Sequence, residues 1–134
     1  MSVFRRERFN AAHRLFNPSW SDEKNAEVFG PCNNPNYHGH NYVIFVKVTG
    51  DVDPDTGYVI DLGILKGIIR EEVTKRFDHK NLNLDVEDFA DLVPTAEHIC
   101  YVAYNRIRNR LPEDMDLQVR LYETERNFVE YPAS

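Results

Sequence analysis

The sequence predicts one α+β domain in which a four-stranded antiparallel sheet carries two helices on one face. The length of 134 residues is enough to bury a single core without disulfide bonds. Segments patterned as strands lie in both halves of the chain, and two segments patterned as helices lie between them. Because no internal repeat and no linker divides the chain, residues 1–134 are expected to form one unit with the order ββααββ.

The first half of the chain supplies the first two strands. Residues 3–13 form an extended, half-exposed segment. The strongest strand prediction is 41–50, NYVIFVKVTG, because β-branched and aromatic residues are dense there. A short surface helix is expected between these strands at 21–29. After the turn residues of 51–57, DVDPDTG, a further short strand is expected at 58–60.

Two amphipathic helices are expected in the middle of the chain. The first begins after Asp61, an N-cap candidate, because apolar residues recur there at intervals of three and four: Leu62, Leu65, Ile68, Ile69 and Val73. The second begins after the N-cap candidate Thr95 and ends by 111–114, LPED. Residues 76–94, between the helices, are expected to be irregular.

The last two strands close the chain. Residues 116–123 alternate between apolar and polar side chains, and a turn at 124–127 leads to a strand at 128–131. The segment 42–48, YVIFVKV, is apolar on both faces, and an open four-stranded sheet has two unpaired edges. Pairing of these edges between the chains of a symmetric oligomer would account for both the apolar second face and the unpaired edges.

Charge and hydropathy exclude two classes of partner. The chain has 16 Lys and Arg against 22 Asp and Glu, a net charge of −6, and no basic run that would contact a phosphate backbone. Nucleic acid is therefore not an expected partner. No stretch has the length of a signal peptide's apolar region or the roughly 18 apolar residues of a membrane span, so we expect a cytoplasmic protein without a membrane partner.

The segment 30–42, GPCNNPNYHGHNY, contains the main candidate for a metal site. His38 and His40 are two residues apart at the start of a strand, so both imidazoles project from one face. With His13 from the neighbouring strand they would give three nitrogen ligands and an open position, the arrangement of catalytic zinc. His-x-His alone is a weak pattern, and a polar loop that happens to contain histidines is the alternative.

The two cysteines stand in different surroundings. Cys32 lies in a Gly/Pro/Asn loop, where a nearby metal or positive group would lower its pKa and suit it to act as a base or nucleophile. Cys100 lies in the apolar pattern of the second helix and is expected to be a small buried residue without chemistry. A disulfide between them is not expected in a reducing compartment.

Three further positions have two interpretations each from the residues alone. Asp78 and His79 could orient one another, but an adjacent pair in a loop is more often solvated. Glu123 falls on the apolar face of its strand and would need N–H donors from a ligand, whereas an exposed glutamate at the strand end is the simpler interpretation. His98, in the first turn of the second helix, is most simply a surface residue.

Six motifs, taken together, resemble one known family. FNAAHRL, FGPCNNPNYHGHNY, DPDTG, FDHKNLN, PTAE and YETERN occur in the order and spacing of the 6-pyruvoyl tetrahydropterin synthase and 6-carboxytetrahydropterin synthase family, and they span nearly the whole chain. The resemblance implies the tunnelling fold (T-fold), in which the strands of three ββααββ subunits close a barrel. It also implies that two such trimers stack into a homohexamer.

The resemblance also implies roles for individual residues. The implied ligands of Zn²⁺ are His13, His38 and His40. The implied catalytic residues are Cys32 as a proton-abstracting thiolate, Asp78 and His79 as a proton relay, and Glu123. The implied pterin contacts are Glu123, Thr95 and Glu97. Ala96 stands where the family often has a second threonine, which removes one hydroxyl contact.

The implied activity is that of a zinc-dependent lyase, without a redox cofactor, that eliminates triphosphate from 7,8-dihydroneopterin triphosphate. The alternative is a 6-carboxy-5,6,7,8-tetrahydropterin synthase of queuosine biosynthesis, which uses the same substrate and releases acetaldehyde as well as triphosphate. The five residues between Cys32 and His38 resemble the pyruvoyl enzymes, whereas 59–62, VIDL, and 95–97, TAE, resemble the carboxy enzymes. Two alternatives belong to other functional classes. One is a non-catalytic pterin-binding module, and the other is a hydrolase or aldolase on a related fold.

Overall fold

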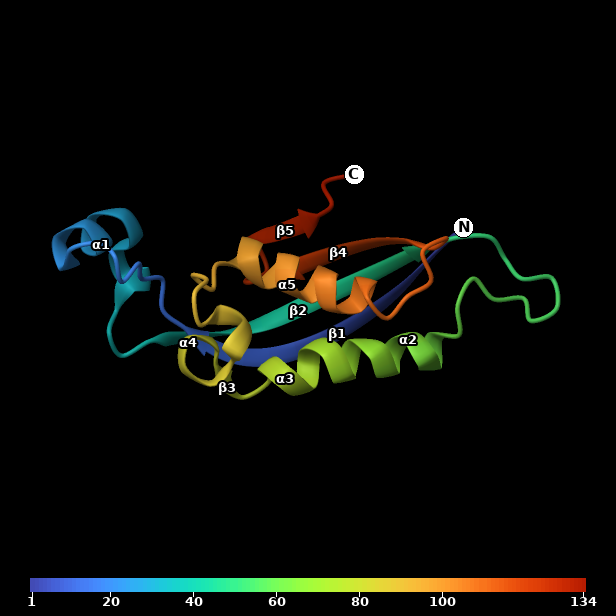
Figure 1. Ribbon diagram of the computed structural model, residues 1–134, viewed down its shortest axis with the longest axis horizontal. Coiled ribbons are helices and arrows are strands. Elements are labelled where there is room, and N and C mark those ends of the chain that lie inside the picture. Colours follow the sequence, from blue (N-terminus) through green and yellow to red (C-terminus); the bar gives the residue numbers. More distant parts are fainter.

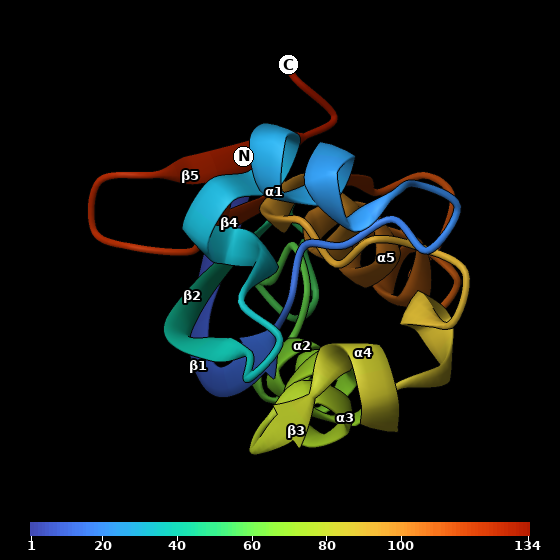
Figure 2. The same cartoon turned by 90° about the vertical axis from the view of Figure 1, so that its left-hand side faces the viewer.

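The computed structural model describes residues 1–134 as one sheet with helices packed on a single face (Figures 1 and 2). The sheet has five strands in the order β3-β1-β2-β4-β5. They are β1 (Ser2–His13), β2 (His38–Thr49), β3 (Lys80–Asn81), β4 (Asp116–Tyr122) and β5 (Phe128–Tyr131). Neighbouring strands are antiparallel except for β3, which runs parallel to β1.

The helices lie in the connections between the strands. They are α1 (Asp22–Phe29), α2 (Leu62–Ile69), α3 (Lys75–Phe77), α4 (Leu82–Asp85) and α5 (Ala96–Arg108). A π-helical turn, Arg70–Thr74, joins α2 to α3, and short 3₁₀ turns occupy Gly30–Asn33 and Glu87–Phe89. Figure 2 shows α2 to α5 on one side of the sheet and α1 at the end nearest the viewer. None of the helices combines the length and the apolar character needed to cross a membrane.

Both predicted starts of the long helices are confirmed. The Asp61 carboxylate accepts hydrogen bonds from the backbone N–H groups of Gly63 and Ile64. The Thr95 hydroxyl accepts one from the backbone N–H of His98. Because N-cap side chains satisfy amide groups that have no partner inside the helix, these two residues fix where α2 and α5 begin.

Two predictions about the strands are wrong. The sheet has a fifth strand, β3, which pairs only with Ala11 and Ala12 and is too short and polar to show a strand pattern in the sequence. Residues 58–60 are not a strand, because the Tyr58 carbonyl accepts the Asp53 N–H at 2.8 Å and closes the turn on itself. β2 begins at His38, as the placement of His38 and His40 at the start of a strand predicted, because the pairing with β1 continues as far as the His13–His38 pair.

The core lies between the sheet and the helices. Alternate residues of β2 point into it and are fully buried: Tyr42, Ile44, Val46 and Val48. They meet buried residues of α2, including Leu65 and Ile69, and of α5, including Ile99 and Ile107. The period of two in the strand and the period of about 3.6 in the helices therefore converge on one apolar layer.

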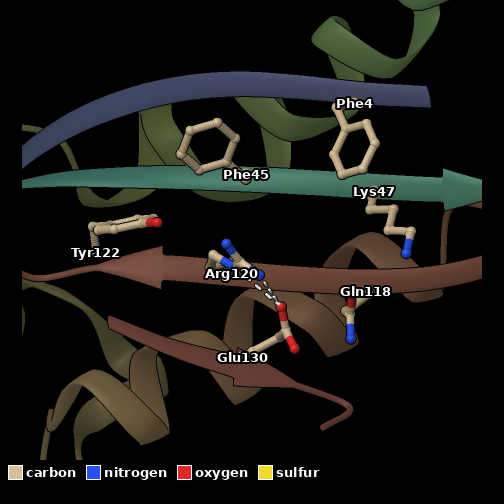
Figure 3. A pocket seen from close by; sticks show the side chains of 7 residues that line it. All are labelled: Phe4, Phe45, Lys47, Gln118, Arg120, Tyr122 and Glu130. Atoms are coloured by element: carbon tan, nitrogen blue, oxygen red, sulfur yellow. Dashed lines mark hydrogen bonds and ion pairs between the residues drawn. The ribbon is translucent and has the colours of Figure 1, made fainter. Parts of the chain in front are cut away.

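The opposite face of the sheet lies away from α2 to α5 (Figure 2), and Figure 3 shows the side chains on part of it. It carries a shallow hollow of about 300 Å³ lined by Phe4, Phe45, Lys47, Gln118, Arg120, Tyr122 and Glu130. The Arg120 guanidinium donates to the Glu130 carboxylate across two neighbouring strands. The aromatic rings on this face explain why the sequence of β2 is apolar on both sides. The edges of the sheet are β5 and, beyond the short β3, the N-terminal part of β1.

Phe77 ends the helical stretch formed by α2, the π turn and α3. Its ring is fully buried, with ring centroids 5.7 Å from Phe9 and 5.6 Å from Phe89. The extra residue per turn in a π helix shifts the positions that follow it, so Phe77 faces the core here. Asp78 and His79 follow Phe77 directly in the chain, so the packing of the Phe77 ring fixes where they lie.

Replacing Phe77 with Ala should lower the free energy of unfolding by about 3–5 kcal/mol, because it opens a cavity between the rings of Phe9 and Phe89. Urea denaturation followed by circular dichroism measures this change. Leu84→Ala is the control, since Leu84 is 69% exposed and its loss should change stability by less than about 0.5 kcal/mol. Equal effects of the two substitutions would contradict the placement of Phe77 in the core.

Candidate functional site

The strand register brings three histidines together at one end of the sheet. His13, the last residue of β1, pairs directly with His38, the first residue of β2. His40 lies two residues further along β2, so its side chain projects from the same face. In Figure 1 this end of β1 and β2 lies close to the start of α5.

The three imidazoles form a cluster with the geometry of a metal site. The Nε2 atoms of His13 and His38 are 2.9 Å apart, and one ring nitrogen of each of the three histidines lies within 4.8 Å of the other two. His13 is buried, and the buried Nε2 of His40 has no hydrogen-bond partner. A buried nitrogen without a partner is costly unless it binds something, so the residues present fit a metal ion.

A backbone carbonyl sets the orientation of His13. Its Nδ1 lies 2.7 Å from the carbonyl oxygen of Pro94, just before α5. A carbonyl only accepts hydrogen bonds, so Nδ1 carries the proton and Nε2 presents its lone pair to the cluster. Such a second partner is usual for histidines that bind metals. Pro94 thus connects the entrance of α5 to the histidine cluster.

Burial favours the neutral form of His13 and His40. Burial lowers the pKa of His13 from 6.5 to about 4; the hydrogen bond to Pro94 opposes this effect, and the nearby His38 and His40 add to it. The pKa of His40 is also lowered, first by burial, although the Glu123 carboxylate acts in the opposite direction. Neutral imidazole is the form that binds a metal, so the site is prepared for a cation at pH 7.

Tyr42 supports the cluster from the core side, a role that the sequence analysis missed. Its ring stacks on Phe9 with centroids 4.9 Å apart, and its hydroxyl lies 3.3 Å from Nδ1 of His13. Burial raises the pKa of this phenol, so it stays protonated. The signal was present in the sequence, because Tyr42 follows His40 by two residues and shares its face of the strand.

Glu123 directs its carboxylate at the same cluster. Its Oε1 lies 3.8 Å from Nε2 of His40 and its Oε2 lies 4.0 Å from Nε2 of His13. Tyr122 pairs with Val43, so Glu123, one residue later, lies beside Tyr42 on the histidine face. The simpler interpretation of Glu123 as an exposed residue is therefore wrong: its side chain is only 25% exposed.

A cavity adjoins the cluster and contains three of the predicted site residues. It measures about 410 Å³, and Thr95, Glu97 and Glu123 all line it. Ala96 lines it as well, with residues of the β4–β5 turn and the start of β5. Since Glu123 faces both the cavity and the histidines, a ligand bound in the cavity would lie beside the cluster.

The structure brings Cys32 near the end of β1 but not into the histidine cluster. Cys32 is half-buried in the 3₁₀ turn after α1, and its carbonyl accepts the N–H of Leu15 at 2.9 Å. Cys100 is buried; its thiol donates to the carbonyl of Val119, and burial raises its pKa to about 12. Cys100 is therefore a small buried residue, as the sequence predicted, whereas Cys32 is half-buried.

Asp78 and His79 form a direct pair at the β3 edge of the sheet. Nδ1 of His79 lies 2.9 Å from Asp78, whose other oxygen accepts the backbone N–H of Asn10 at 2.8 Å. This N–H, with His79, holds the pKa of Asp78 below its usual range. The side chain of His79 is 83% exposed and is not part of the cluster. The pair is therefore exposed, as expected for a solvated loop, but the hydrogen bond from the Asn10 N–H of β1 fixes the position of Asp78.

His98 is not the simple surface residue that the sequence suggested. It is half-buried, and its Nδ1 lies 2.7 Å from the carbonyl oxygen of Val93. This bond holds the segment before α5 against the first turn of the helix. Because Pro94 lies in that segment, His98 stabilises the carbonyl that orients His13.

Comparison with known proteins agrees with this geometry. The family model of 6-pyruvoyl tetrahydropterin synthase matches residues 2–134. The 6-pyruvoyl tetrahydrobiopterin synthase of Homo sapiens is 45% identical over 129 residues, 96% of this chain and 89% of that protein. A 6-carboxy-5,6,7,8-tetrahydropterin synthase of Rickettsia typhi is 29% identical over 94% of this chain and 96% of its own length.

The solved structure of 6-pyruvoyl tetrahydropterin synthase from Caenorhabditis elegans superposes on this one with a TM-score of 0.93 and 40% sequence identity. The superposition covers 100% of this chain and 96% of the Caenorhabditis elegans chain, so no element of the fold lacks a counterpart. The expected α+β fold and the resemblance seen in the motifs are both confirmed. The chain belongs to the 6-pyruvoyl tetrahydropterin synthase family.

Proposed function

We propose that this protein is a 6-pyruvoyl tetrahydropterin synthase, a lyase that eliminates triphosphate from 7,8-dihydroneopterin triphosphate in tetrahydrobiopterin synthesis. One observation carries the proposal: a cavity lined by Thr95, Glu97 and Glu123 adjoins a cluster of three histidines. The family membership and the 45% identity to the human enzyme agree with it. A cavity of about 410 Å³ is within the usual size of a small-molecule site.

The residues of the cavity suit a pterin ring. A pterin presents ring N–H and amino groups on one edge, and carboxylates accept such groups strongly. Glu123 is the proposed partner of that edge, with Thr95 and Glu97 as further contacts. The methyl group of Ala96 adds apolar surface to the same wall.

His13, His38 and His40 would hold a zinc ion, which supplies a Lewis acid for oxygens of the substrate's hydroxylated side chain. The three imidazole nitrogens and the lowered pKa of His13 support this assignment. Pro94 orients His13, so a shift of the α5 entrance would disturb the ligand set and the cavity together.

Proton transfers on the substrate are assigned to Cys32 and His79. The Cys32 thiolate takes a proton from a side-chain carbon, and triphosphate leaves with the electron pair of its C–O bond. His79, oriented by Asp78, returns a proton elsewhere on the substrate. The pterin ring is reduced as the side chain is oxidised, so the reaction needs no external redox cofactor.

The assembly that we propose is a homohexamer of two trimers. The edge at β5 and the N-terminal part of β1 both offer unpaired backbone groups, which neighbouring chains could pair into a closed barrel. Light scattering should then give the mass of six chains. A cytoplasmic location suits the two cysteines, which are both free thiols.

The second candidate function is that of a 6-carboxytetrahydropterin synthase in queuosine biosynthesis. The specific observation in its favour is Ala96 in the cavity wall, in the Thr95-Ala96-Glu97 segment that resembles those enzymes. A non-catalytic pterin-binding module is the candidate of another class. The ordered Asp78–His79 pair and the accessible Cys32 argue against it, because binding alone requires neither.

Cys32→Ala should bind zinc as the wild-type protein does but release triphosphate at least about 100-fold more slowly, because it lacks the proposed base. Metal analysis and a triphosphate assay measure the two properties. Cys100→Ala is the matched control: it removes the other thiol, which is buried away from the site, and should keep its turnover. Turnover that survives in Cys32→Ala would remove this thiol from the mechanism.

The product distinguishes the two branches of the family. Incubation with dihydroneopterin triphosphate should release triphosphate without acetaldehyde, because the proposed reaction keeps all the side-chain carbons. Enzymatic detection of acetaldehyde against released triphosphate provides the measurement. Stoichiometric acetaldehyde would instead assign the protein to the carboxy branch.

The metal-free protein should lose stability as the pH falls from 6.5 towards 4. In this range the unfolded state binds a proton on His13 that the folded state excludes, which costs up to about 3 kcal/mol at pH 4. Chemical denaturation of chelator-treated protein at several pH values measures the slope. His13→Asn should show a shallower slope, and identical slopes would contradict the buried neutral state of His13.

A further inference from the structure

Glu123 occupies the boundary between the histidine cluster and the cavity. It lines the cavity, while both of its carboxylate oxygens face imidazole nitrogens. A residue that only anchored a ligand would direct its carboxylate into the cavity, away from the cluster. Its position therefore calls for a second role, which rests on the function proposed above.

The distances at Glu123 are too long for hydrogen bonds. The oxygens lie 3.8 Å from His40 and 4.0 Å from His13, beyond hydrogen-bond length. Two ligand atoms of one tetrahedral zinc ion, each at 2.0–2.2 Å from it, lie about 3.4 Å apart, so a shift of about half an ångström would bring Glu123 into the coordination sphere. Glu123 is thus within reach of an ion held by the same nitrogens.

The carboxylate of Glu123 has no hydrogen-bond donor within the chain. Its only charged or imidazole contacts are His13 and His40, beyond hydrogen-bond length, and its side chain is 25% exposed. A partly buried anion without donors is costly unless a cation or a bound ligand compensates it.

Glu123 is also free to turn. It follows the last residue of β4, and its backbone N–H donates to the Asn127 carbonyl at 3.0 Å across an exposed turn. Rotation of the side chain breaks no hydrogen bond of the sheet. The same carboxylate can therefore face the histidines when the cavity is empty and face a ligand when it is filled.

We propose that Glu123 is a conditional fourth ligand of the metal. In the ligand-free protein its carboxylate completes the coordination that His13, His38 and His40 begin. When a pterin enters the cavity, Glu123 turns to accept the ring N–H groups and leaves one coordination position open for the substrate's side-chain oxygens. Glu123 thereby couples recognition of the ring to the opening of the metal.

Zinc affinity tests the first half of this proposal. Glu123→Gln keeps the shape of the side chain and should bind zinc about 10–100-fold more weakly in a chelator competition, because the amide is a poor ligand. Glu125→Gln, two residues along the same turn and exposed, is the matched control and should keep the wild-type affinity. Wild-type affinity in Glu123→Gln would overturn the proposal, provided that its thermal unfolding matches that of the wild type.

The visible spectrum of the Co²⁺-substituted protein tests the second half. Adding 6-methylpterin, which lacks the hydroxylated side chain, should shift the wild-type spectrum towards that of ligand-free Glu123→Gln. Identical ligand-free spectra of wild type and Glu123→Gln, or no shift on saturation of the wild type with 6-methylpterin, would overturn the conditional role.

Triphosphate release by the wild type separates this inference from the proposed function. If the wild type releases triphosphate but Glu123→Gln binds zinc with unaltered affinity, the proposed function is supported and the role of Glu123 as a fourth ligand is wrong. Weakened zinc binding in Glu123→Gln without any release by the wild type would support the ligand but contradict the reaction.

Discussion

The pairing register of β1 with β2 is the constraint on which the rest of the site depends. It runs without a bulge from Ser2–Thr49 to His13–His38. Because side chains alternate along a strand, a slip of one residue would turn the histidines to the opposite face and the apolar residues out of the core. Burial of Tyr42, Ile44 and Val46 therefore stabilises the metal site indirectly, since the register that buries them also aligns the histidines.

A second constraint couples the sheet to α5. The Pro94 carbonyl orients His13, and the next residue, Thr95, caps the helix and lines the cavity. The histidine cluster and the ligand cavity thus share one backbone segment. Glu123 joins them from the other side, at the end of β4. In the proposed function, this arrangement would link recognition of a flat ring to chemistry at a metal held by the three histidines.

Much of this could be predicted because the signals were local. The density of β-branched residues identified β2, the caps Asp61 and Thr95 marked two helices, and the period of two placed His38 and His40 on one face. The contribution of His13 came from its neighbouring strand together with the family motifs. The same period extends to Tyr42, which was missed only because a tyrosine in a strand is usually part of the core.

The remaining features depend on tertiary contacts that no local pattern encodes. β3 is held by pairing with Ala11 and Ala12, and its own two residues carry no strand signal. The true surroundings of Glu123 became apparent only when β4 was aligned with β2. The pairing of Asp78 with His79 depends on the N–H of Asn10, a residue distant in sequence.

The central claim is that the three histidines and the adjoining cavity form one site for a metal and a pterin. A crystal structure of the zinc-loaded protein with a bound pterin, with anomalous data at the zinc edge, tests it most directly. The account predicts one zinc ion among His13, His38 and His40, and a pterin ring beside Thr95 and Glu97. Zinc bound elsewhere, or a pterin lying in the hollow on the face of the sheet away from α2 to α5, would contradict it.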